Sequence, residues 1–143
     1  MTETIKKTEA RYALDPVAFA KALLLAPLIV AAFGFWALLI PVFAVLFGGL
    51  PYLVLGTPIL MIYLYFAEGT PGGAAKIAFS TVAVIVLAFW VYRLFFDVHR
   101  YDDGLVIWAG FSLIFAGLWG FAFGKLYNRW SSPMSRRPLP PLA

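Results

Sequence analysis

Three aspartates and the only histidine of the chain gather in residues 97–103. Imidazole and carboxylate groups are competent ligands for divalent cations, so this segment could hold a metal ion. The candidate ligands are Asp97, His99, Asp102 and Asp103. A structural zinc site uses four ligands at a recognisable spacing, which is absent here. We therefore favour a solvated polar turn between two helices and predict no metal site.

Arg93 lies four residues before Asp97, at the end of a long apolar run. A charge inside a membrane is costly and is a functional candidate by default. On a helix, however, side chains four residues apart can pair, and an arginine can extend to the membrane surface. We predict a rim ion pair between Arg93 and Asp97, or an interface anchor, ahead of a role in transport.

Four glycines in the last apolar run could allow close packing of helices. They are Gly110, Gly117, Gly120 and Gly124. Their spacing places them on one helical face, and the last two form a GxxxG match. Glycines of this kind let a second backbone approach closely, which drives helix association in lipid. We favour another helix of this chain as the partner, with a helix of another protein as the alternative.

Cofactor and catalytic chemistry find little support in the residue types. The same run carries Phe111, Phe115, Trp119 and Phe121, which could face lipid, partner helices or the ring of a pigment or quinone. One histidine cannot supply paired axial haem ligands, although a second subunit could add another. The absence of cysteine excludes disulfides, iron–sulfur clusters and thiolate sites. No phosphate loop, nucleophile elbow or zinc-protease motif occurs. We predict no catalytic residues and no cofactor, and leave pigment, quinone or haem contact open.

Composition defines the class of protein that must position these residues. Hydrophobic residues make up 63% of the 143 residues and charged residues 13%, whereas soluble domains are about half apolar and a quarter charged. No residue between Lys21 and Glu68 carries a formal charge. As one straight helix this run would extend roughly 70 Å, over twice the thickness of a bilayer core. It must therefore fold back, and Gly48-Gly49 before Pro51 is the predicted turn.

These patterns predict an all-α integral membrane protein with a bundle of four transmembrane helices. Asp15 is the expected N-cap of the first helix and Pro16 its first residue. The predicted spans cover about 22–46, 50–67, 77–96 and 105–123 within a membrane domain of residues 16–127. Residues 1–15 form a cytoplasmic N-terminal segment and residues 128–143 a proline-rich, basic cytoplasmic tail. A re-entrant loop is the alternative for the second span.

The basic residues predict the orientation. With four spans, both termini and the loop around Glu68 share one side, and every lysine and arginine except Arg93 and Arg100 falls there. The positive-inside rule places that side in the cytoplasm. Short loops and the absence of targeting segments favour a bacterial inner membrane.

The leading functional hypothesis is an accessory or assembly subunit of a larger membrane complex, acting by lateral helix packing. The alternative is a small oligomeric transporter, channel or lipid-flipping protein, and the third is a membrane enzyme or cofactor-binding subunit. No acidic residue, histidine or lysine lies centrally in a span, which disfavours a proton-coupled transporter. The expected partners are the lipid bilayer and other membrane subunits or further copies of the chain. The net charge of +4 marks the cytoplasmic face, and we predict no binding to nucleic acid.

Overall fold

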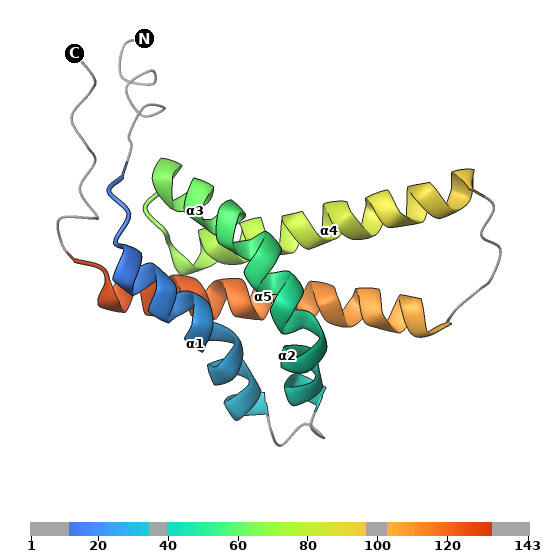
Figure 1. Cartoon of the computed structure of the whole chain (residues 1–143), viewed down its shortest axis with the longest axis horizontal. Helices are drawn as coiled ribbons and strands as arrows, with labels where there is room; N and C mark the ends of the chain where they lie inside the picture. Colours follow the sequence, from blue (N-terminus) through green and yellow to red (C-terminus); the bar gives the residue numbers. More distant parts are fainter. Residues whose placement is uncertain (1–11, 35–39, 97–102, 133–143) are drawn as a thin grey trace, which may run out of the picture.

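The computed structural model describes residues 12–34, 40–96 and 103–132, and almost all of them are helical (Figure 1). The elements are α1 (Pro16–Gly34), α2 (Ile40–Pro51), the π-helix η1 (Tyr52–Gly56), α3 (Thr57–Phe66), α4 (Pro71–Phe95) and α5 (Asp103–Trp130). Within these residues, four helical stretches are long and apolar enough to cross a membrane: Pro16–Gly34, Gly48–Phe66, Pro71–Phe95 and Val106–Trp130. The prediction of an all-helical chain with four candidate spans is therefore confirmed.

The predicted turn at Gly48-Gly49 is not found. Both glycines lie inside α2, which continues through η1 and α3 as one helical stretch from residue 40 to residue 66. The gap between α1 and α2 covers residues 35–39, which lie outside the described part of the chain. Gly48 serves a different purpose, because a Cβ atom there would lie 3.2 Å from Cη2 of Trp119. The glycine gives the indole ring of α5 room against the second helical stretch.

Local hydrogen bonds keep this stretch helical across two prolines. Pro51 and Pro58 have no N–H to donate, so each removes a hydrogen bond from the helix ladder. The π-helix η1 lies between them, and the hydroxyl and backbone N–H of Thr57 both donate to the Leu53 carbonyl. Such π adjustments and threonine bonds make proline tolerable in apolar surroundings. A continuous helix of this length favours a full crossing over the re-entrant alternative.

Capping explains where α1 and α4 begin. The carboxylate of Asp15 accepts a hydrogen bond from the Ala18 N–H at 3.0 Å, as an N-cap should. Helix α4 begins at Pro71, earlier than the predicted start near residue 77. The Thr70 hydroxyl caps it by accepting from the Gly73 N–H at 3.2 Å.

Helix α5 also runs past its predicted end, through the first residues of the predicted tail, and stops at Trp130. Its last turns are held by the core, in which Tyr127 is 4% exposed. The described part of α1 ends at Gly34, and residues 40–46 of the predicted first span belong to α2 instead.

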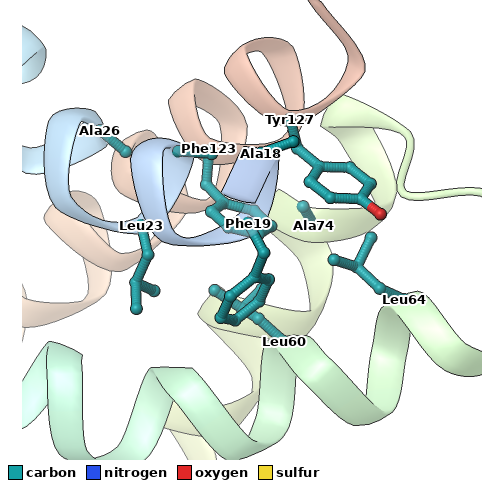
Figure 2. Close-up of a cluster of buried hydrophobic side chains, with 10 residues drawn as sticks. Ala18, Phe19, Leu23, Ala26, Leu60, Leu64, Ala74, Phe123 and Tyr127 are labelled. Carbon is teal, nitrogen blue, oxygen red and sulfur yellow. The ribbon is translucent and has the colours of Figure 1, made fainter. Parts of the chain in front are cut away.

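The hydrophobic core collects side chains from α1, α3, α4 and α5 near one end of the bundle (Figure 2). Phe19 and Phe123 meet edge to face, with ring centroids 5.4 Å apart, a favourable arrangement for aromatic rings. Leu60 and Leu64 approach the same cluster from α3 (Figure 2). We call this the closed end, because the start of α1, the α3–α4 connection and the end of α5 meet there.

Two hydrogen bonds donated by backbone N–H groups join these segments at the closed end. The Ser132 N–H donates to the Asp15 carboxylate at 3.2 Å, and the Tyr12 N–H donates to the Tyr65 carbonyl at 3.1 Å. From here the long α4–α5 pair and the α1–α2 pair run in different directions (Figure 1). We call the far end of the α4–α5 pair the open end. Leu94 and Phe95 of α4 are both 81% exposed there.

Candidate functional site

The four glycines of α5 fall into two groups. A Cβ atom on Gly120 would lie 2.7 Å from the Ala74 carbonyl oxygen, and one on Gly124 would lie 2.6 Å from Cα of Pro71. The GxxxG pair is therefore in close backbone contact with the start of α4. At Gly110 and Gly117, by contrast, an added Cβ would meet no atom of the described residues within 4 Å.

The predicted metal and ion-pair residues lie mostly beyond the described structure. Asp97, His99 and Asp102 fall outside it, and of Asp103 only the helical backbone is described. Among the residues that the structure does describe, no group of three potential ligands could hold a metal ion. The ion pair between Arg93 and Asp97 stays a prediction. The Arg93 guanidinium lies 5.9 Å from the ring centroids of both Phe89 and Trp90.

A cavity of about 520 Å³ lies between the second helical stretch, α4 and α5. We call it the crevice. It reaches from Trp119, beside the core, to Gly104 near the start of α5, about 22 Å along that helix at 1.5 Å per residue. The further lining is largely apolar and includes Pro51, Tyr52, Leu55, Ile59, Val82, Ile85, Val86, Ile107, Trp108, Phe111 and Phe115. Its volume is within the range of about 300–1,000 Å³ that is common for small-molecule sites.

Few polar groups line the crevice. The Thr81 hydroxyl donates to the Ile77 carbonyl at 2.8 Å, so its proton is bound within its own helix. Ser112 adds a second hydroxyl to the wall. The lining otherwise includes the ring donors of Tyr52, Trp108 and Trp119, and Trp108 is half exposed. The Tyr52 hydroxyl and the Trp119 indole N–H are buried and have no hydrogen-bond partner among the described residues.

These two unpartnered donors belong to adjacent rings. The Tyr52 and Trp119 rings pack edge to face with centroids 5.1 Å apart, and Trp119 is 4% exposed. A buried donor without a partner costs about 1–3 kcal/mol and calls for an explanation. Trp119 was among the residues predicted to face lipid, partner helices or a cofactor ring, whereas Tyr52 was not among the predicted site residues. The only signal was a phenol in an apolar run directly after Pro51, which does not reveal the pairing across helices.

The aromatic residues predicted on α5 are divided between the crevice and the outer surface. Phe111, Phe115 and Trp119 line the crevice, and the two phenylalanine rings stack with centroids 6.4 Å apart. Phe121 is 46% exposed, and the Lys125 ammonium lies 5.7 Å from its ring centroid. One side of α5 thus presents a row of rings to the crevice.

Polar contacts at the closed end hold chain segments together. The N–H groups of Ala18 and then Ser132 lower the pKa of Asp15, because they stabilise its ionised carboxylate. Burial, followed by the charge of Glu68, raises the pKa of Tyr12. The Tyr12 hydroxyl donates to the Glu68 carboxylate at 3.4 Å. These groups bind one another, so we assign them to the fold and regard the crevice and the free glycine face as the functional candidates.

Known proteins give no further guide to either feature. Comparison of the chain with protein family models, curated protein sequences and solved structures finds no match. A functional assignment therefore depends on the residues and their arrangement.

Proposed function

We propose that this chain is a multi-pass membrane protein that acts by lateral packing, as an accessory or assembly subunit of a larger membrane complex. The observation that carries this proposal is the division of the α5 glycines. Gly120 and Gly124 are covered by α4, whereas Gly110 and Gly117 have open space in front of them. The chain uses its GxxxG pair for its own fold and has further glycines to offer to another helix.

The unused glycines form part of a continuous strip on α5. Residues at intervals of three and four share one face of a helix. We define the lateral face as Gly110, Ile114, Gly117 and Phe121; Ile114 is 60% exposed and Phe121 46%. Exposed apolar side chains alone mean little in lipid, because acyl chains cover them equally well. Small residues between large ones are more informative, because they let a second helix come close enough for extensive van der Waals contact.

We also propose that the closed end faces the cytoplasm of a bacterial cell and that the four spans cross its inner membrane. Lys76, Lys125 and Arg129 lie toward the closed end of α4 and α5. The basic residues of the two terminal segments adjoin the same end in sequence, whereas Arg93 and Arg100 adjoin the open end. Cytoplasmic loops are enriched in lysine and arginine, which supports this orientation.

The test is co-purification from native membranes in mild detergent, with partners identified by mass spectrometry. We expect the parent chain to retain a larger membrane protein and Gly117→Leu to lose it, because the added side chain would hold a partner helix away. Gly72→Leu is the matched control. Gly72 also has nothing within 4 Å of an added Cβ, but it lies near the start of α4, at the closed end.

Three outcomes would contradict the proposal. One is recovery of a lone monomer from native membranes, and another is retention of the partner by Gly117→Leu at the level of the parent. The third is a second copy of this chain as the sole partner, which would contradict the accessory role. Unfolding curves of each variant in detergent would establish that lost association does not reflect lost folding.

A further inference from the structure

The crevice combines a large apolar space with two buried donors that have no acceptor. Within the part of the chain that the structure describes, neither the Tyr52 hydroxyl nor the Trp119 N–H has a hydrogen-bond partner, and both residues belong to the crevice wall. Buried polar groups in proteins are normally satisfied, and an exception calls for an explanation such as a bound molecule. An occupant of the crevice that carried an acceptor oxygen would supply the missing partner.

The positions of the donors restrict the occupant. Tyr52 lies close to the midpoint of the helical stretch from residue 40 to residue 66, and Trp119 lies within one turn of the midpoint of α5. If these helices cross a bilayer, both donors are near its midplane. The ester carbonyls of phospholipids lie at the edge of the hydrocarbon core, roughly 15 Å away. A phospholipid therefore cannot bring its ester oxygens to this depth from its normal position.

Two other membrane components also fail to satisfy the donors. An acyl chain fits an apolar space but has no acceptor along its length. The carbonyls of a neighbouring transmembrane helix already accept hydrogen bonds within that helix. Thr57 and Thr81 add second bonds to such carbonyls, but each does so from the same helix, four residues away. A molecule that moves within the hydrocarbon core and carries a ring carbonyl meets both requirements.

We propose that the crevice binds a flat, carbonyl-bearing ring lipid of the quinone class. The Tyr52 hydroxyl and the Trp119 N–H donate to a ring carbonyl, and the stacked rings of Phe111 and Phe115 border the same space. Neither donor atom has exposed surface. Binding therefore includes a rotation of the Tyr52 or Trp119 ring toward the crevice. The proposal concerns binding and is independent of the lateral face of α5.

The test uses the full chain in nanodiscs made of phosphatidylcholine without quinone. Equilibrium dialysis against 1,4-naphthoquinone, with empty nanodiscs as the blank, measures binding beyond partition into lipid. We expect saturable binding of one naphthoquinone per chain. Naphthalene, which has the same ring size and no carbonyl, should bind about 5- to 160-fold more weakly, the ratio that the two hydrogen bonds provide together.

Conservative variants separate hydrogen bonding from shape. Tyr52→Phe and Trp119→Phe should each weaken naphthoquinone binding about 2- to 12-fold and leave naphthalene binding unchanged. Trp90→Phe and Tyr92→Phe, whose parent residues lie outside the crevice lining, should change neither. Ile85→Trp should abolish binding of both compounds, because the larger side chain occupies the crevice.

The proposal would be overturned by equal affinity for naphthoquinone and naphthalene, or by unchanged affinity in both donor variants. Thermal unfolding without quinone gives a second check. Removing a hydroxyl that lacks a partner should not lower the midpoint of Tyr52→Phe. A lowered midpoint would mean that the hydroxyl is already bonded in the empty protein, which would also overturn the proposal.

Discussion

The closed and open ends of the bundle are formed by helices of similar apolar character, yet they pack very differently. At the closed end Phe123 is completely buried, and Asp15 joins the start of α1 to Ser132 after α5. At the open end Leu94 and Phe95 are mostly exposed, and the crevice separates α5 from the second helical stretch. Hydrophobicity therefore does not account for where this bundle is tight.

The difference follows the placement of small residues. Lipid tails are as apolar as leucine, so burial of apolar surface does not by itself drive helices together in a membrane. Close packing requires backbones that can approach each other, as Gly120 and Gly124 do against Ala74 and Pro71. Farther along, α4 presents large exposed side chains such as Val84 and Leu87. The open end of the bundle consequently keeps apolar surface free for other molecules.

The largest effect should come from overfilling the tight contact. In Gly120→Leu the new side chain would meet the backbone of α4, which cannot move aside as a flexible side chain would. We expect a loss of about 3 kcal/mol in the free energy of unfolding, at the upper end of typical overpacking costs. Unfolding by sodium dodecyl sulfate in mixed micelles would measure it. Gly117→Leu, at an open position of the same helix, should keep a free energy of unfolding close to that of the parent. Equal losses of stability in Gly120→Leu and Gly117→Leu would contradict the difference in packing between these two positions.

A smaller loss in the free energy of unfolding should follow from removing a ring of the hydrophobic core. Phe123→Ala removes a fully buried ring that packs against Phe19. In soluble proteins such a change costs about 3–5 kcal/mol. We expect about 2 kcal/mol here, because the unfolded chain stays in lipid and only packing contacts are lost. The same unfolding assay applies to Phe121→Ala, the exposed control. If the control lost as much as Phe123→Ala, the core would not be confined to the closed end.

The smallest effect should come from the polar contacts of Asp15. Its folded-state pKa is lowered from the ordinary value of 3.8. The stabilisation is therefore fully present above that value and is lost as pH falls through the lower folded-state pKa. Unfolding midpoints of the parent and Asp15→Asn should differ at neutral pH and converge as the solution is acidified below about pH 4. A difference that persisted at low pH would show that the ionised carboxylate is not what holds the ends together.

Several elements of the fold were predictable because their causes are local. Asp15 and Pro16 begin α1 through hydrogen bonds and backbone angles that involve only neighbouring residues. Four apolar stretches likewise follow from composition and length. The turn at Gly48-Gly49 was predicted incorrectly for an instructive reason. Glycine breaks helices when water competes for the backbone, whereas in this bundle the helix continues and an indole ring packs over Gly48.

The candidate sites were less predictable, because each depends on residues that are distant in sequence. The glycine spacing indicated a packing face, but nothing in it separates Gly120 from Gly117. The separation arises from how α4 packs against α5, because an added Cβ would meet α4 only at the later pair. Similarly, Tyr52 and Trp119 are unremarkable singly and meet only when two helices cross.

The sequence by itself determined the apolar helices, the start of the first one and the basic segments at both ends of the chain. These properties depend on hydrogen bonds within a helix and on the transfer of side chains into an apolar phase, both of which are local. Only the tertiary structure decided which glycines are covered, where α2 remains helical and which rings form the crevice. Those features depend on the relative placement of helices, which van der Waals contact between distant segments sets and residue spacing alone does not encode.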